Sequence, residues 1–302
     1  MQIANKAFTR TRLAPTPSGY LHIGNILSFA ITAAIAKRTN ARILLRIDDA
    51  DRERTNLAYV QDIFDTLNFL EIPWHEGPKN VQEYSKEYSQ LFRMDLYRQA
   101  LEELRATGEL FACSCSRTQV LAINADGAYP GTCIDKQQSF ETEHITWRIC
   151  ADERTVVEVK NLDGTITNAT LPHNMSGFIV RKRDGFPAYQ LTSLIDDLYF
   201  GVDLVVRGAD LWPSTVAQLY LAKLLNKTNF LQTTFYHHPL LNDASGHKLS
   251  KSEGATSVHY LRRDGKSPSY IYGQIAAMFG VSEPIHNWEQ LITLVEDKLN
   301  DR

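Results

Sequence analysis

Strand-like and helix-like segments alternate between residues 9 and 69, and this alternation constrains the fold more than any other feature of the sequence. Residues 41–47 read ARILLRI, a nearly continuous apolar run typical of a strand buried on both faces of a parallel sheet. We expect a second strand at residues 9–14 and helices at residues 26–37 and 56–69, where apolar residues recur at helical spacing. This order predicts βαβ units and therefore an α/β domain.

The alternation is interrupted in the middle of the chain and then returns. A long amphipathic helix is expected at 84–107, after which residues 111–144 show little periodicity but hold three of the four cysteines. Further strands are expected at 145–159, 178–180, 203–206 and 235–241, with helices at 188–199 and 211–225. The simplest organisation is an α/β domain made of residues 1–110 and 176–252, an insertion at 111–175, and a short helical segment at 253–302.

Composition excludes several classes of protein. Hydrophobic residues make up 43% and charged residues 22%, which argues against a disordered or fibrous chain. No apolar run approaches the roughly 18 residues that span a bilayer, and four cysteines are too few for a dense disulfide framework. We therefore expect a cytoplasmic protein with no membrane partner. The formal net charge of -3 excludes a polycation, but it leaves room for local positive charge.

A glycine-containing turn, PSGYLHIGN at residues 17–25, separates the first strand from the first helix. Glycine lets the backbone approach a phosphate, and the start of the following helix presents free N–H groups. His22, Gly24 and Asn25 are thus candidates for binding a nucleotide. The alternative is that Gly24 only relieves crowding and His22 is an ordinary turn residue.

A second glycine- and serine-containing loop, GHKLSKS at residues 246–252, follows the last expected strand. Lys248 and Lys251 lie three residues apart, which suits a clamp on the charge that develops on pyrophosphate. A solvated basic loop is the alternative for such a motif on its own.

Together, LHIGN and KLSKS resemble the HIGH and KMSKS signatures of class I aminoacyl-tRNA synthetases. The resemblance implies a Rossmann-like catalytic domain in which both loops bind ATP with Mg²⁺ while a carboxylate attacks the α-phosphorus. It makes His22, Gly24, Lys248 and Lys251 catalytic, and His22, Gly24, Asn25, Asp210 and Lys251 ligands of ATP. Such a reaction depends on positioning and charge stabilisation, and the sequence offers no obvious nucleophile.

The residues around these loops resemble the glutamyl and glutaminyl branch of the family. RLAPTPSG at 12–19 is similar to its RFAPSPSG opening, and RIDDAD at 46–51 to its RIEDxD strand end. The family's order continues with RKRDGFPAYQL at 181–191, the pair Asp196-Asp197, and VRGADL at 206–211.

The resemblance implies that the substrate is L-glutamate. Arg12 and Tyr189 would contact its side-chain carboxylate and Arg207 its α-carboxylate, in a site that also includes Leu13, Ala14, Pro15 and Thr16. Planar guanidinium groups bind carboxylates bidentately, although a surface ion pair is the commoner role of an arginine. Asp48 replaces the family's glutamate, which is expected to hold the substrate's ammonium group. Because aspartate is one methylene shorter, a bridging water or a small backbone shift is expected.

Cysteines gather in the insertion as Cys113, Cys115 and Cys133, and three thiolates are one short of a tetrahedral zinc site. On residue types alone, Cys113 and Cys115 are also compatible with buried strand positions. The C-x-C…Y-x-x-x-C pattern is similar to that of the short glutamyl-queuosine tRNA(Asp) synthetases, which implies Tyr129 as the fourth Zn²⁺ ligand. Cys150 is expected in the core.

The length of the chain agrees with this short family, because about fifty residues follow Lys251 and a helical anticodon-reading domain needs more. The resemblance then implies activation of glutamate without tRNA, and its transfer to queuosine at the wobble position of tRNA(Asp). We expect a monomer. Three alternatives remain: a minimal glutamyl-tRNA synthetase that charges the 3′ end of tRNA(Glu), a small-molecule nucleotidyltransferase, and a non-enzymatic zinc-containing RNA-binding module. Arg181, Lys182, Arg183, Arg262 and Arg263 are expected to supply the positive charge for RNA, together with the two lysines of the KLSKS loop.

Overall fold

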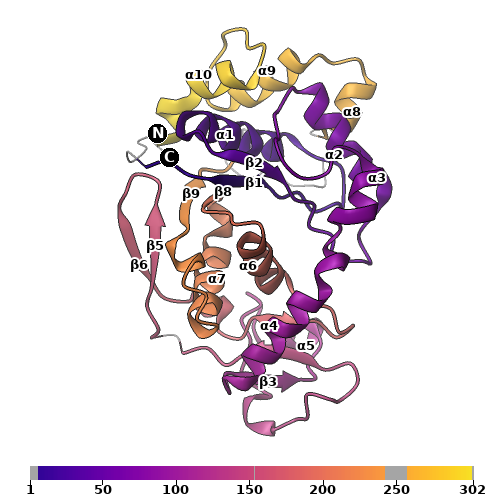
Figure 1. Ribbon diagram of the computed structural model, residues 1–302, viewed down its shortest axis with the longest axis vertical. Coiled ribbons are helices and arrows are strands. Elements are labelled where there is room, and N and C mark those ends of the chain that lie inside the picture. Colours follow the sequence, from indigo (N-terminus) through magenta and orange to yellow (C-terminus); the bar gives the residue numbers. More distant parts are fainter. Residues whose placement is uncertain (1–5, 153, 242–256, 301–302) are drawn as a thin grey trace.

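A computed structural model describes residues 6–152, 154–241 and 257–300 (Figure 1). The expected Lys248 and Lys251 lie outside the described residues. No described helix combines the length and the apolar character needed to cross a membrane.

Parallel strands form the centre of the molecule. β1 (Arg10–Leu13) pairs in parallel with β2 (Arg42–Leu45), and β8 (Leu204–Gly208) pairs in parallel with β9 (Thr234–His238). β1 lies beside β8, where the Asp203 amide donates to the Arg10 carbonyl at 3.1 Å. Beyond β9 follow β5 (Val157–Asn161), which is parallel to it, and β6 (Ile166–Ala169), which is antiparallel to β5. The expected parallel α/β core is confirmed.

Helices cover both faces of these strands (Figure 1). α1 (Ile23–Thr39) lies on one face with the C-terminal helices, and α6 (Tyr189–Tyr199) and α7 (Trp212–Leu224) lie on the other. α1 is apolar nearly all round because it is packed between the strands and α10. It begins at a His22 N-cap and ends at Asn40, which adopts the left-handed conformation of a C-cap. α2 (Leu57–Phe69) follows β2, and the C-terminal helices are α8 (Val258–Arg263), α9 (Pro268–Met278) and α10 (Trp288–Asn300).

The middle of the chain forms a separate antiparallel sheet at the end of the molecule distant from the two termini (Figure 1). It consists of β3 (Leu110–Cys113), β4 (Thr146–Ile149) and β7 (Ile179–Arg181), and α5 (Arg117–Ile123) accompanies it. Two features differ from expectation. Residues 145–159 form β4 and β5, which belong to different sheets, and β7 joins this small sheet rather than the parallel one. The domain boundaries at residues 110 and 175 remain a prediction.

The single helix expected at residues 84–107 is wrong. The chain forms a short α3 (Val81–Glu83), a π-helical turn (Tyr84–Tyr88), a 3₁₀ turn (Gln90–Arg93) and α4 (Met94–Ala106). The break occurs at Ser89, whose backbone leaves the helical conformation at ψ 143°, because buried Asp49 recruits donors from this segment. Its carboxylate accepts from the Tyr84 hydroxyl at 2.7 Å, the Ser89 hydroxyl at 2.6 Å and the Gln90 amide at 2.7 Å. These bonds compensate the burial of the charge, and a continuous helix would not supply the Gln90 amide.

Candidate active site

A cavity of about 630 Å³ opens at the carboxyl ends of β1, β8 and β9. Ligands of open α/β sheets bind at this edge. Eleven of the residues expected in the site line the cavity: Arg12, Leu13, Ala14, Pro15, Thr16, His22, Gly24, Asn25, Tyr189, Arg207 and Asp210. They come from segments nearly two hundred residues apart, so the fold brings the motifs together as the resemblance requires.

Asp48 does not line this cavity in the part of the chain that the structure describes. Its carboxylate lies against Arg46, with the two oxygens at 2.7 and 3.1 Å from the guanidinium nitrogens Nε and Nη2. The Asp48 amide donates to the carbonyl of Pro15 at 3.0 Å, which ties it to the cavity wall. Desolvation raises the pKa of Asp48, against the lowering effect of Arg46. Binding of an ammonium group by Asp48 remains a prediction.

His22 is the N-cap residue of α1. Its Nδ1 accepts a hydrogen bond from the Gly24 amide at 3.1 Å, and its own amide donates to the Asn25 side chain at 3.1 Å. A Cβ atom at position 24 would lie 3.0 Å from the imidazole ring, which explains why glycine suits this place. The turn therefore presents an imidazole and the positive end of a 17-residue helix to the cavity, an arrangement suited to phosphate.

Arg207 is a buried cation without a carboxylate partner among the described residues. Its side chain is 3% exposed, and only Nη2 has a partner, the amide oxygen of Gln218 at 3.1 Å. Desolvation lowers the pKa of Arg207 to about 10. A buried guanidinium with two unpartnered nitrogens at a cavity favours an anionic ligand, because an unpaired buried charge is costly.

Arg12 lines the same cavity, and its guanidinium group is hydrogen-bonded within the protein. Its Nε lies 3.2 Å from Asp197 Oδ1, and its Nη1 lies 3.3 Å from the carbonyl of Val206. The neighbouring Tyr189 begins α6 and is 40% exposed. Two arginines and a phenol in one cavity are suited to binding a molecule with more than one carboxylate.

A buried network of ion pairs behind the cavity was missed at the sequence level. Arg46 bonds to Asp48 and Asp197, and Arg93 holds the adjacent Asp196 at 2.7 and 3.0 Å. The available signal was the pair Asp196-Asp197 beside the apolar residues Leu194 and Ile195 of an expected helix, because two buried acids require nearby cations.

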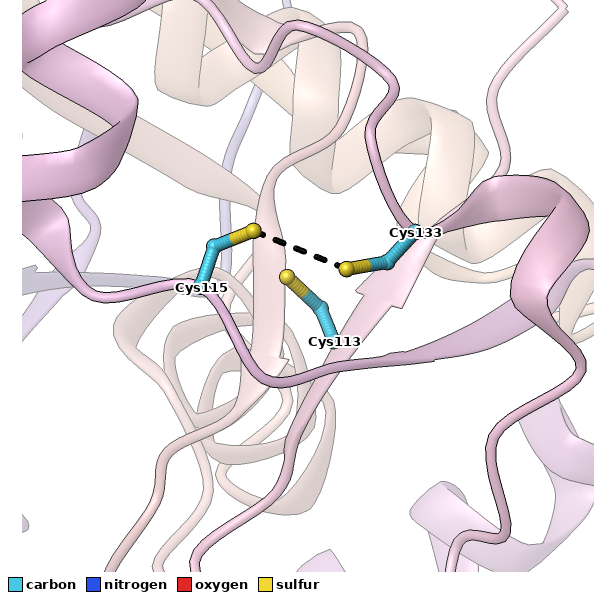
Figure 2. A group of neighbouring side chains, drawn as sticks. All are labelled: Cys113, Cys115 and Cys133. Atoms are coloured by element: carbon cyan, nitrogen blue, oxygen red, sulfur yellow. Dashed lines mark hydrogen bonds between the residues drawn. The ribbon is translucent and has the colours of Figure 1, made fainter.

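Three cysteine side chains of the insertion point toward one another (Figure 2). The sulfurs of Cys113, Cys115 and Cys133 lie within 4.8 Å of one another, close enough for one metal ion. The Tyr129 hydroxyl lies 3.3 Å from the Cys113 sulfur and accepts a hydrogen bond from the Cys133 amide at 2.9 Å.

The chemistry of this cluster fits zinc. Burial opposes ionisation of Cys133, but interactions with Tyr129, the Ser114 backbone and the other two thiols lower its pKa to about 6. A thiolate available near neutral pH is what Zn²⁺ binds. Cys150 packs against the cluster but is not one of its three thiols, and it is half-buried rather than in the core as expected.

Comparisons with known proteins agree with this geometry. Residues 9–298 match the family model described as tRNA synthetases class I (E and Q), catalytic domain. The chain is 34% identical to a glutamyl-Q tRNA(Asp) synthetase of Prochlorococcus marinus (strain MIT 9303), over 89% of this chain and 81% of that protein. It is 32% identical to a glutamyl-Q tRNA(Asp) synthetase of Pseudomonas aeruginosa (strain LESB58), over 95% and 98%.

A solved structure supports the fold alone. The glutamate tRNA ligase of Elizabethkingia meningosepticum superimposes with a TM-score of 0.69 at 19% identity, covering 94% of this chain and 64% of that one. The chain therefore belongs to the class I tRNA synthetases of the E and Q group, a family of ligases, and its relatives there include proteins named glutamyl-Q tRNA(Asp) synthetase.

Proposed function

We propose that this protein activates L-glutamate with ATP in the absence of tRNA, and then transfers the glutamyl group to the queuosine base at the wobble position of tRNA(Asp). The observation that carries the glutamate assignment is Arg207, a buried cation that lacks a carboxylate partner in the described chain and lies in one cavity with Arg12. The queuosine assignment is supported by two relatives that are named glutamyl-Q tRNA(Asp) synthetase and match this chain over most of both lengths.

The first step needs no protein nucleophile. Arg207 holds the α-carboxylate of glutamate, and Arg12 and Tyr189 hold its side-chain carboxylate. One α-carboxylate oxygen attacks the α-phosphorus of ATP, the bond to the bridging oxygen of the β-phosphate breaks, and pyrophosphate leaves. His22, Asn25 and the N-terminus of α1 stabilise negative charge on the phosphates, and Asp210 contacts the nucleotide. Mg²⁺ supplies further neutralisation of the triphosphate.

Lys248 and Lys251, which lie outside the described residues, are proposed as the second set of phosphate ligands. Lys251→Ala should slow adenylate formation in single-turnover measurements while glutamate affinity changes little, because the lysine acts on developing pyrophosphate charge. Much weaker glutamate binding would contradict this role.

We propose that Cys113, Cys115, Tyr129 and Cys133 hold one structural Zn²⁺, which would tie β3 to the loop that follows α5. Metal analysis should find about one zinc per chain and little in Cys113→Ser. Tyr129→Phe should retain zinc but release it to a chelator more readily, because only the weakest ligand is lost. Metal-free native protein would contradict the site, and an unchanged affinity in Tyr129→Phe would exclude the tyrosine as a ligand.

Two measurements test the proposed function. Glutamate-dependent exchange of pyrophosphate into ATP should proceed with no tRNA added, and no exchange with any amino acid would exclude the enzyme activity. Labelled glutamate should then be transferred to tRNA(Asp) from cells that make queuosine, on the anticodon fragment, and not to tRNA(Asp) from cells that lack it. Label at the 3′ end of tRNA(Glu) would show instead a minimal glutamyl-tRNA synthetase.

A further inference from the structure

Arg46 occupies the centre of the buried network, directly after β2. Its side chain is 2% exposed, and its guanidinium group is bonded through all three nitrogens. Nε and Nη2 contact the two Asp48 oxygens at 2.7 and 3.1 Å, and Nη1 contacts Asp197 Oδ1 at 2.6 Å. Nη2 also lies 3.3 Å from the Ser193 hydroxyl on α6. The planar guanidinium group of Arg46 thus connects the end of β2 to α6.

The contact to Asp197 continues to the cavity. Asp197 Oδ1 accepts from Arg46 Nη1 at 2.6 Å and from Arg12 Nε at 3.2 Å, so one carboxylate oxygen bridges the two arginines. Arg12 is then oriented from behind, and its remaining N–H groups are left for a ligand on the cavity side. The orientation of Arg12 therefore depends on Arg46.

The contact to Asp48 reaches a different part of the site. Arg46 fixes both oxygens of this carboxylate, and the backbone of the same segment follows the cavity wall. The Arg46 amide donates to the Leu13 carbonyl at 2.9 Å, and the Asp48 amide donates to the Pro15 carbonyl at 3.0 Å. Both Leu13 and Pro15 line the cavity.

We propose that Arg46 is a positioning residue for the glutamate site. Through Asp197 it orients Arg12 for the side-chain carboxylate, and it fixes Asp48, whose backbone is bonded to the cavity wall, at the end of the site predicted to take the ammonium group. This inference rests on the proposed function. Arg46 itself does not line the cavity, so it acts through its two partners and not on the substrate.

The geometry requires a guanidinium group and not only a positive charge. Lysine carries a single ammonium group at the end of a flexible chain, so it cannot hold two oxygens of Asp48 and one of Asp197 in a fixed plane. Although desolvation opposes it, the combined field of Asp48, Asp197 and Asp196 raises the pKa of Arg46 well above its usual range. The cation is therefore permanent across the pH range in which proteins fold.

Arg93 provides a matched control. It is also buried, at 5% exposed, and it also makes a two-point ion pair, with Asp196 at 2.7 and 3.0 Å. Asp196 further accepts from the Tyr97 hydroxyl at 2.6 Å. Neither Arg93 nor Asp196 contacts Arg12 or Asp48 by any hydrogen bond in the described chain. Asp196 Oδ2 lies 3.9 Å from Arg46 Nε, so a lysine at position 93 perturbs the same network at its edge, without a contact to Arg12 or Asp48.

The test compares Arg46→Lys and Arg93→Lys with the wild-type chain by calorimetric titration of three ligands and ATP. L-Glutamate has all three charged groups, glutarate lacks the ammonium group, and L-glutamine lacks the side-chain carboxylate. In Arg46→Lys we expect glutamate affinity to fall roughly 10- to 100-fold, as small displacements of positioned groups do. Affinity for the two analogues should fall much less, and affinity for ATP should change less than about twofold, because the phosphate-binding turn is not involved. Arg93→Lys should keep the preference for glutamate while its midpoint of thermal unfolding falls.

A general structural defect would weaken glutamate and its analogues equally, so an unchanged preference in Arg46→Lys would overturn the inference. An equal loss of preference in Arg93→Lys would also overturn it. If Arg46→Lys does not fold, Asp197→Asn provides the test, because Asp197 orients Arg12 but not Asp48. This variant should lose the preference for glutamate over glutamine and keep the preference for glutamate over glutarate. Wild-type protein that binds no glutamate would contradict the proposed function itself, whereas wild-type binding with unaffected variants would contradict only the role of Arg46.

Discussion

At the scale of single residues, the strongest expectation concerns Arg207. Its guanidinium is 3% exposed and has two nitrogens without partners among the described residues. We therefore expect an anionic ligand to accept hydrogen bonds from these nitrogens. Arg207→Gln should weaken glutamate binding about 10- to 100-fold, since a hydrogen bond to a charged group contributes about 1.5–3 kcal/mol. Calorimetric titration measures this effect.

The matched control is Arg181→Gln. Arg181 belongs to β7 and donates to the carbonyl of Ile145 at 3.1 Å in the small antiparallel sheet, away from the cavity. Glutamate affinity should stay within about twofold of wild type in this variant. Equal losses in both variants would show that the effect of position 207 is not local.

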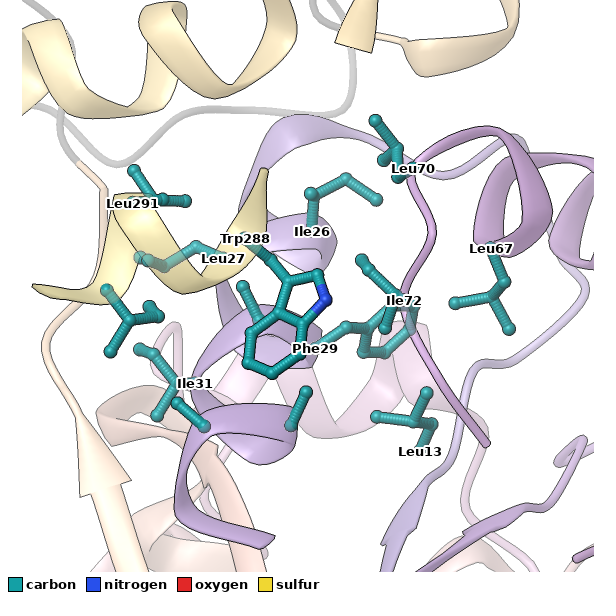
Figure 3. Packing of buried hydrophobic residues seen from close by; sticks show 14 of the residues in the cluster. Leu13, Ile26, Leu27, Phe29, Ile31, Leu67, Leu70, Ile72, Trp288 and Leu291 are labelled. Atoms are coloured by element: carbon teal, nitrogen blue, oxygen red, sulfur yellow. The ribbon is translucent and has the colours of Figure 1, made fainter. Parts of the chain in front are cut away.

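At the scale of secondary structure elements, the attachment of α10 to α1 depends on Trp288. Figure 3 shows its indole among buried side chains of α1 that include Leu27 and Phe29. The indole N–H donates to the Glu71 carbonyl at 3.1 Å. Trp288→Ala should reduce the free energy of unfolding by about 3–5 kcal/mol, because it removes a large buried side chain and leaves a cavity. Leu294→Ala, at a position of the same helix that is 39% exposed, should cost less than about 1 kcal/mol in urea unfolding.

The same pair of helices is joined by a two-point ion pair whose effect depends on pH. Arg38 donates to the two oxygens of Glu296 at 2.7 and 2.6 Å, and this contact lowers the pKa of Glu296 to about 2. A carboxyl pKa depressed in the folded state stabilises fully above the unfolded value of 4.5 and loses that effect as the pH falls toward 2. The difference in melting temperature between wild type and Glu296→Gln should therefore be largest at neutral pH and disappear near pH 2. A difference that does not change with pH would contradict this origin.

Elements also show where sequence reasoning succeeds. α1, α2, α6 and α7 lie within a few residues of their expected bounds, because each repeats apolar residues along a face that is buried locally. The helix expected at 84–107 fails at Ser89, because the distant Asp49 recruits donors from its first turns. The periodicity of apolar residues around Ser89 cannot show that Asp49, forty residues earlier, will bind this segment.

At the scale of the whole molecule, the motifs predicted the cavity but not the buried network of ion pairs behind it. Arg12, Tyr189 and Arg207 were expected in one site because of the family resemblance, and the two arginines also because strand ends meet at one edge of a parallel sheet. The Arg46–Asp197 contact joins residues 151 positions apart, and its existence depends on the relative placement of β2 and α6. The sheet formed by β3, β4 and β7 was missed for the same reason, since strand periodicity does not identify a strand's partners.

Arg207, which has no carboxylate partner among the described residues, has a consequence for the stability of the whole chain. A ligand that binds only the folded state stabilises it by about 2.7 kcal/mol at one hundred times its dissociation constant. At one glutamate concentration, the melting temperature of the wild-type chain should therefore rise clearly more than that of Arg207→Gln, in a thermal-shift measurement that needs neither ATP nor tRNA. A cell's supply of this amino acid would then govern not only how often the protein acts but also how much of it survives heat and proteases.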